Sequence, residues 1–256
     1  MANINQKNTG DGLFSFSGGI VYHWRALMAR LPGKSKLAWD AHRASVQVFL
    51  EHWGLLALTQ LPPLVLVGCS GGYSLPEAWL KEYLAKGGKI IAVEPDALAR
   101  KIFTFRMGFK PEFITSAIDF ENLKPFLSQI PKESAILFCN VMGQITVQSE
   151  SKLMSELQML CSGRRWASYH DVISGEGIRI DVPDAFKNTE VSKQALSDLK
   201  QWVHFEDDES DQDDIRELNL HLAYDFFPAS LGHHFHYWEW KLTGHQTQLI
   251  EGVYAL

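Results

Sequence analysis

The sequence has little of what marks a membrane-spanning, secreted, metal-binding or nucleic-acid-binding protein. No stretch approaches the ~18 consecutive apolar residues of a membrane helix, and residues 1–12 are too polar for a secretory signal. The formal net charge of −6 gives no strong nucleic-acid signal. The three cysteines, Cys69, Cys139 and Cys161, lie far apart without metal-ligand spacing. We therefore expect a cytoplasmic protein with reduced thiols, no metal and no membrane partner.

Hydrophobic periodicity, by contrast, is abundant. Of the 256 residues, 46% are hydrophobic and 12% aromatic, which suits a chain that buries a substantial core. Apolar residues have helical spacing in 19–30 and 38–59, and from residue 63 short apolar runs alternate with helical patterns. We expect strands at 63–67, 89–93, 112–115, 135–139 and 164–169, and helices at 75–86, 96–106, 119–128 and 148–160.

This alternation predicts an α/β fold. Repeated β–α units with short connections form a Rossmann-like, doubly wound, mostly parallel sheet with helices on both faces. A helical N-terminal extension, residues 1–60, is expected to precede a single compact unit, residues 61–256.

The C-terminal part has a different pattern. Residues 192–203 are typical of a helix, and the seven carboxylates within 205–214 predict a solvated loop. Residues 217–225 and 234–242 alternate in polarity, which predicts an antiparallel C-terminal strand pair, and 246–254 adds a further strand.

A glycine-rich loop follows the first buried strand. Gly68-Cys69-Ser70-Gly71-Gly72 allows a sharp turn and close approach of a ligand, and Glu94 lies 22 residues beyond Gly72 at the expected tip of the second strand. An acid at this distance is placed to bind ribose hydroxyls. Ser74 with Glu77 forms a capping-box pattern and predicts the helix start. The alternative is a structural turn with a surface glutamate.

Residues 63–101, PLVLVGCSGGYSLPEAWLKEYLAKGGKIIAVEPDALARK, resemble the cofactor half of the class I S-adenosylmethionine-dependent methyltransferases. The similarity continues at 117–120, at 136–145 and at 155–172. It implies an S-adenosylmethionine cofactor and a small-molecule or protein acceptor. The implied cofactor-binding residues are Gly68, Cys69, Ser70, Gly72, Glu94, Pro95, Asp119, Phe120, Asn140 and Val141. Two positions depart from the family pattern: Leu66 replaces an acid that contacts the cofactor's amino group, and Ser70 replaces the middle glycine.

Candidate catalytic residues follow the later strands. Asn140 and Gln144 are placed to orient an acceptor amine or hydroxyl, although a helix-capping turn explains them equally well. His170 is a candidate general base, although a structural or substrate-lining role is favoured. Tyr22, on an expected N-terminal helix, is a further substrate-binding candidate.

Two rival functions use the same residues. Gly68–Gly72 also reads G-x-S-x-G, the nucleophile elbow of α/β-hydrolases, with Ser70 as nucleophile, Asp171 as acid and His233 or His234 as base. A helix that starts at Ser74, rather than directly after Ser70, favours a ligand loop instead. The second rival is a non-catalytic methyltransferase-like binding module, which Leu66 would suit.

The histidines near the C-terminus also allow a metal interpretation. His234 and His236 share one face of an expected strand, but Trp238 and Trp240 share that face too, which favours packing.

Overall fold

The computed structural model describes residues 34–120, 122–142, 149–187, 189–205, 218–221, 234–242 and 246–256. The chain divides into two compact units, which we treat separately. Unit 1 comprises Met1–Ser45 and Asp171–Val253, and unit 2 comprises Val46–His170 and Tyr254–Leu256. The helix predicted at 19–30 and the acidic loop at 206–214 lie outside the described residues. The predicted division at residue 60 stays a prediction.

Unit 2 contains the parallel part of the sheet. Each strand pairs in parallel with its neighbours in the order β3-β2-β1-β4-β5, so the chain winds outward from β1 in both directions. β1, β2 and β4 are buried throughout, as their continuous apolar runs predicted. The strands are β1 Leu64–Val67, β2 Ile90–Val93, β3 Glu112–Ile114, β4 Ala135–Cys139 and β5 Trp166–Glu176.

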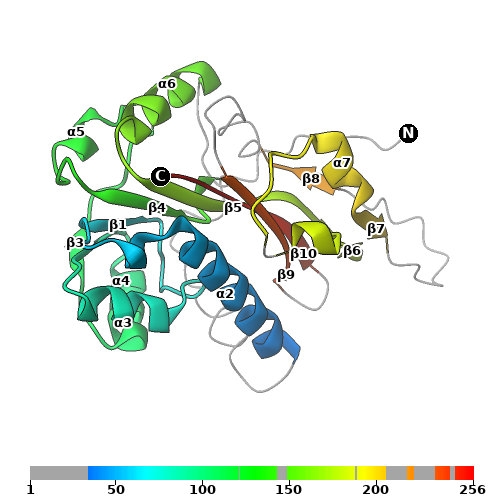
Figure 1. Ribbon diagram of the computed structural model, residues 1–256, viewed down its shortest axis with the longest axis horizontal. Helices are drawn as coiled ribbons and strands as arrows, with labels where there is room; N and C mark the ends of the chain where they lie inside the picture. Colours follow the sequence, from blue (N-terminus) through cyan, green and yellow to red (C-terminus); the bar gives the residue numbers. More distant parts are fainter. Residues whose placement is uncertain are drawn as a thin grey trace. The chain divides into compact units, whose positions relative to one another are not determined.

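Helices cover both faces of these strands. α3 and α4 lie on one side, and α5 and α6 lie on the other (Figure 1). Right-handed crossovers require this, because the chain moves to β2 and β3 in one direction and then to β4 and β5 in the other. The doubly wound, mostly parallel fold class predicted from the sequence is confirmed. The helices are α3 Glu77–Ala85, α4 Ala97–Met107, α5 Lys124–Leu127 and α6 Glu150–Cys161.

α4 has clear local reasons to begin and end where it does. The Asp96 side chain accepts hydrogen bonds from the amides of Leu98 (2.7 Å) and Ala99 (3.4 Å), which caps the N-terminus. Gly108 ends the helix in the left-handed conformation, with φ 69°. Phe103 and Met107, four residues apart, are fully buried, so α4 presents one apolar face to the strands.

Two predicted helices are shorter in the structure. The helix expected over 119–128 is reduced to α5, because Asn122 N donates to Asp119 O in a turn and Pro125 fits only a first helical turn. The helix expected over 192–203 is α7, Leu196–Gln201, which leads directly into a strand.

Unit 1 contains the second half of β5 and the C-terminal strands. β10, Gln246–Ala255, lies between β5 and the edge strand β9, His234–Lys241. A connection this short requires β9 and β10 to run antiparallel, so an antiparallel C-terminal pair is present. The predicted partner was wrong: β8, Leu218–Leu220, pairs antiparallel with β5 rather than with β9. β6, Ile178–Ile180, and β7, Val203–Phe205, form a separate two-stranded sheet.

An aromatic cluster in unit 1 joins α2, Lys34–Trp53, to β9. His42 is 1% exposed, stacks on Trp240 with ring centroids 3.9 Å apart, and accepts a hydrogen bond from Trp238 Nε1 at 3.1 Å. Trp39 meets Trp240 edge to face at 4.9 Å. These contacts confirm that Trp238 and Trp240 serve packing. Burial, helped by nearby Arg43, lowers the pKa of His42 to about 3.

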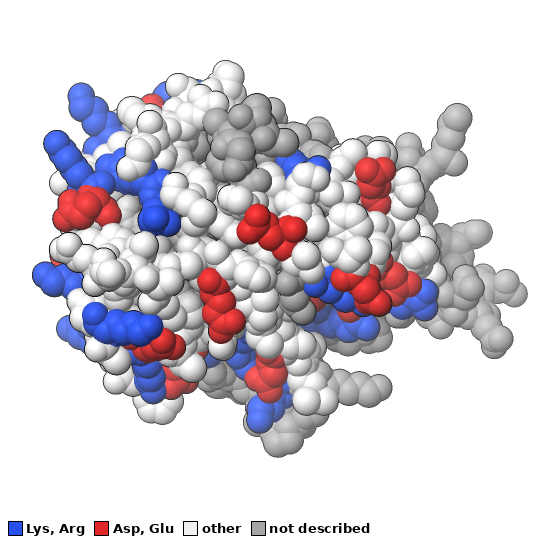
Figure 2. Space-filling model, viewed as in Figure 1, with Lys and Arg blue, Asp and Glu red and all other residues white. Residues whose placement is uncertain are grey.

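The described surface has a mixed charge. Lys and Arg side chains lie among Asp and Glu on the face drawn in Figure 2, so the described part of this face has no field of one sign. Among the helices that the structure describes, none combines the length and apolarity needed to cross a membrane.

We expect neutral His42 to make the protein acid-sensitive. Its pKa is about 3 when folded and 6.5 in the unfolded reference, so the unfolded state binds an extra proton between these values. The contribution of neutral His42 to the free energy of unfolding is therefore fully present above pH 6.5. It declines as the pH falls below this value, by up to ~1.4 kcal/mol per pH unit. Urea unfolding across this pH window should show that the free energy of unfolding depends less steeply on pH in His42→Gln than in wild type. His52→Gln, on the exposed part of the same helix, is the control; equal slopes for wild type and His42→Gln would contradict the expectation.

Candidate functional site

The loop after β1 crosses the carboxyl edge of the sheet, at the point where the winding direction reverses between β1 and β4. Ligands bind at such switch points in open α/β sheets. The loop runs from Gly68 to Pro76, because α3 begins only at Glu77. Turn hydrogen bonds from Gly72 N to Cys69 O (2.8 Å) and from Leu75 N to Gly72 O (3.2 Å) shape it internally.

Glu94 lies at the tip of β2, as predicted, and its carboxylate is engaged by the backbone. Oε2 accepts a hydrogen bond from Ser70 N at 2.8 Å, and Oε1 accepts one from Asp96 N at 3.0 Å. The residue is only 7% exposed, and burying an ionised carboxylate is costly unless donors compensate it. The two amides therefore fix one acid at the glycine loop.

Arg100 braces the backbone that carries this acid. Its Nη1 donates to the carbonyl oxygens of Glu94 (2.8 Å) and Pro95 (2.7 Å). Pro95 is itself exposed at the strand tip. Sequence reasoning missed Arg100, although an arginine one turn into the following helix was the available signal.

Gly68 and Gly72 of the loop lie close to other parts of the protein and have positive φ. A Cβ on Gly68, whose φ is 68°, would come within 2.7 Å of Val141 Cβ. A Cβ on Gly72, with φ 70°, would come within 2.5 Å of Met107 Cε on α4. The loop is thus pressed against the end of β4 on one side and against α4 on the other. Val141 and the glycine loop therefore lie side by side.

Two residues singled out from the sequence have unusual backbones. Ser70, with φ 48°, and Asn140, with φ 52°, are the non-glycine residues with positive φ in the described part of the chain. This left-handed conformation costs an L-residue roughly 1–2 kcal/mol, and such strain gathers at functional sites. Both residues follow strands that flank the switch point, and Asn140 N donates to Tyr169 O at 2.8 Å.

The site contains buried groups that stay neutral. Cys69 and Cys139 are 3% and 4% exposed, and burial raises the pKa of both thiols, that of Cys139 to about 12. Burial, and after it the neighbouring Cys139, raise the pKa of Tyr169 well above its ordinary value. Leu66, where the family pattern has an acid, is fully buried between its strand partners Ala92 and Leu137.

The capping-box prediction at Ser74 was wrong. Pro76 is the N-cap residue of α3, without a side-chain hydrogen bond, and Ser74 Oγ lies 2.7 Å from Tyr169 OH instead. The later helix start also contradicts the hydrolase elbow, in which the helix must follow the serine at once. The backbone amide of Ser70 donates a hydrogen bond to Glu94.

The remaining sequence candidates are only partly brought to this edge. Asp119 is exposed and Phe120 half-buried in the segment after β3, and their role at an adenine ring stays a prediction. His170 is fully buried on β5, with Nδ1 2.9 Å from Ser168 Oγ. Tyr22, Gln144 and His233 lie outside the described residues.

Asp171 has a partner that sequence reasoning missed. In unit 1 its Oδ2 lies 3.2 Å from His221 Nε2 and accepts from Gln248 Nε2 at 3.3 Å. Ser174 Oγ is 2.9 Å from the same His221 nitrogen. His170 and Asp171, as strand neighbours, project to opposite faces, so the carboxylate orients His221 instead. His234, the proposed hydrolase base, pairs with Glu190.

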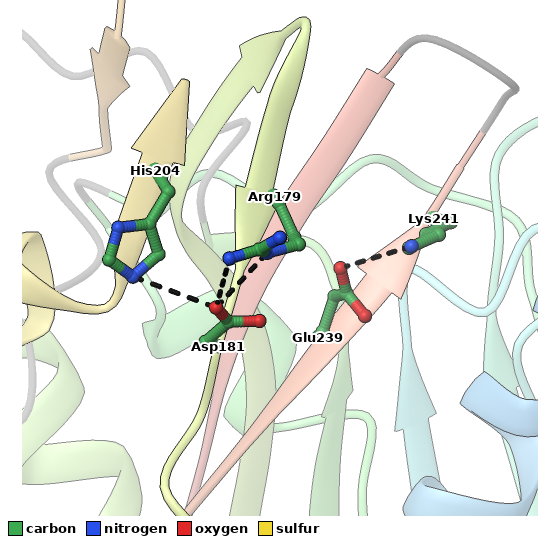
Figure 3. A network of polar contacts seen from close by, with 5 residues as sticks. All are labelled: Arg179, Asp181, His204, Glu239 and Lys241. Atoms are coloured by element: carbon green, nitrogen blue, oxygen red, sulfur yellow. Dashed lines mark hydrogen bonds and ion pairs between the residues drawn. The ribbon is translucent and has the colours of Figure 1, made fainter. Parts of the chain in front are cut away.

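A second polar cluster in unit 1 lies at the surface. Arg179 binds Asp181 at 2.8 Å, His204 lies 3.7 Å from the same carboxylate, and Lys241 approaches Glu239 at 3.6 Å (Figure 3). The side chains of the Asp181 group are about half exposed, so water screens these pairs and they contribute little. In the described ranges, no group of three or more His, Cys, Asp or Glu residues is arranged to hold a metal ion.

Comparison with known proteins finds methyltransferases along nearly the whole chain. The protein is structurally similar to magnesium protoporphyrin IX methyltransferase (ChlM) from Synechocystis PCC 6803 with bound SAM. The TM-score is 0.45 and the identity 12%, and the match covers 98% of this chain and 99% of that one. It is similar to the N-methyltransferase NodS from Bradyrhizobium japonicum WM9, with TM-score 0.41, 10% identity and coverage of 84% and 94%. It is also similar to a TehB-like SAM-dependent methyltransferase from Corynebacterium glutamicum ATCC 13032 Kitasato, with TM-score 0.37 and 9% identity, and the match covers 92% of this chain and 96% of that one.

No family model and no curated protein matches the sequence. At identities of 9–12% and TM-scores below 0.5, these similarities do not establish what the protein does. The activity therefore has to be argued from the site itself.

We expect Gly68→Ala to destabilise the protein strongly. The new Cβ adds left-handed strain and collides with Val141, which together cost about 2–4 kcal/mol. Gly87→Ala is the matched control, because Gly87 also has positive φ but nothing within 4 Å, so it carries the backbone cost alone. Val141→Ala in the Gly68→Ala background should recover part of the loss. Urea denaturation of the three variants and of wild type measures this; equal losses for Gly68→Ala and Gly87→Ala would refute the contact.

Proposed function

We propose that the protein is an S-adenosylmethionine-dependent methyltransferase that acts on a small-molecule or protein acceptor. The observation that carries the proposal is Glu94: a buried carboxylate, held by two backbone amides, at the tip of the strand next to a glycine loop. An acid in this place is suited to accept hydrogen bonds from the hydroxyls of a ribose.

The residues present fit the nucleoside half of such a cofactor. Glu94 would hold the ribose, and Asp119 and Phe120 would flank the base. Gly68, Cys69, Ser70 and Gly72 would pass the methionine part, with Asn140 and Val141 opposite them at the end of β4. Leu66 supplies no carboxylate for the amino group, so this half of the cofactor depends on backbone groups and neutral side chains.

The chemistry asks little of the protein beyond placement. When bound, the cofactor supplies a methyl group activated on a sulfonium, so the chain must align an acceptor with it and exclude water. The strained backbone of Ser70 and Asn140 supports this role, because both residues are held in fixed geometry beside the switch point. Asn140 remains the candidate for orienting the acceptor.

Calorimetric titration with S-adenosylmethionine and S-adenosylhomocysteine tests the proposal. We expect binding in the micromolar range and a loss of tenfold or more in Glu94→Ala, because hydrogen bonds to a charged group contribute roughly 1.5–3 kcal/mol. Glu94→Gln should also bind poorly, since its amide NH₂ meets a backbone donor. Glu112→Gln, which changes an exposed acid on neighbouring β3, is the control.

The two outcomes have different consequences for function. Binding that is lost with Glu94 and kept with Glu112→Gln directs the next work to an acceptor screen. Absence of wild-type binding at millimolar ligand would overturn the active-methyltransferase proposal and leave a non-catalytic module.

A further inference from the structure

Tyr169 connects the far side of the candidate site to the glycine loop. It stands on β5 opposite Cys139 of β4, is fully buried, and places its phenol oxygen 2.7 Å from Ser74 Oγ. The two residues are 95 positions apart in the sequence. The contact therefore ties the end of the loop to a strand two places away from β1 in the sheet.

Three side chains from three elements hold this one loop. Glu94, at the tip of β2, accepts from Ser70 N, and Arg106 of α4 donates to Gly71 O at 2.7 Å. The Arg106 guanidinium also lies over the Tyr73 ring, 5.1 Å from its centroid. Tyr169 holds the last of the three points, at Ser74. Without it, the chain between Gly72 and Pro76 loses its hydrogen bond to β5.

The Tyr169 anchor differs from the other two in its electrostatics. Burial raises the pKa of the phenol well above its ordinary value, so it keeps its proton throughout the physiological range. The hydroxyl pair is neutral, whereas Glu94 and Arg106 bring charged side chains to the loop. A neutral contact suits a site where Leu66 stands in place of an acid and two neighbouring thiols stay protonated.

We propose that Tyr169 is a positioning residue that fixes the conformation of the loop 68–76 through Ser74 and, resting on the proposed function, thereby sets the affinity for the adenosine cofactor. A loop that is ordered before the ligand arrives does not have to be ordered by binding. Removal of the phenol hydroxyl leaves Ser74 without this partner, and the loop then samples other conformations.

The experiment compares Tyr169→Phe, Ser74→Ala and the double variant with wild type. Tyr83→Phe is the matched control, because it also removes a tyrosine hydroxyl from unit 2, one that donates to Pro62 O away from the loop. Hydrogen exchange of peptides covering 68–76 reports loop order without any ligand. Titration with S-adenosylhomocysteine reports affinity.

We expect faster exchange of 68–76 in Tyr169→Phe and Ser74→Ala, and exchange like wild type in Tyr83→Phe. The dissociation constant should rise on the order of tenfold in each single variant. The double variant should be no worse than Tyr169→Phe alone, because Ser74→Ala removes a contact that this variant has already lost. This loss should be independent of pH between about 6 and 9, where the phenol does not titrate.

The loop readout separates this inference from the proposed function. If wild type binds no S-adenosylhomocysteine but the Tyr169→Phe loop exchanges faster, the positioning role stands and the cofactor assignment fails. Equal exchange of 68–76 in Tyr169→Phe and Tyr83→Phe would overturn the positioning role. Additive losses of affinity in the double variant would overturn it as well.

Discussion

Two backbone amides that meet the carboxylate of Glu94 are the contact on which the candidate site depends. Through Ser70 N this contact fixes the loop after β1, and through Asp96 N it fixes the start of α4. A buried carboxylate without such donors would be costly, so the conformations of the loop and of the start of α4 depend on each other through Glu94. Arg100 and Arg106 extend the arrangement by binding carbonyl groups on the same two segments.

Sequence patterns identified the parts that local chemistry determines. Buried parallel strands such as β1 are unbroken apolar runs, so the doubly wound fold class and the position of Glu94 at a strand tip could be predicted, and Asp96 and Gly108 delimit α4 close to its predicted range. Long-range contacts were not predictable. The Ser74 capping box is locally sound, but the phenol of Tyr169 takes its hydroxyl instead. Alternation in 217–225 indicated a strand without indicating that β5 is its partner.

The site differs in character from the family pattern that its sequence resembles. Gly68 is favoured by its positive φ and by the closeness of Val141, and Gly72 chiefly by its positive φ, so their presence reflects the conformation and packing of the loop as much as access for a ligand. The acid expected at position 66 is replaced by a buried leucine, and the thiols and phenol nearby stay protonated. Recognition would therefore rest on the ribose end and on loop order rather than on charge at the amino-acid end.

The high pKa values of the thiols bear on labelling the protein. Only thiolates react readily with maleimides and acrylamides, and burial raises the pKa of Cys69, of Cys139 and, to about 12, of Cys161. Cys69 and Cys139, which are buried as well, are therefore poor targets for such reagents near neutral pH, and the half-buried Cys161 is disfavoured by its raised pKa. A single cysteine introduced at an exposed position such as Phe105, which is 90% exposed on α4, would carry a fluorophore selectively without first removing the native ones.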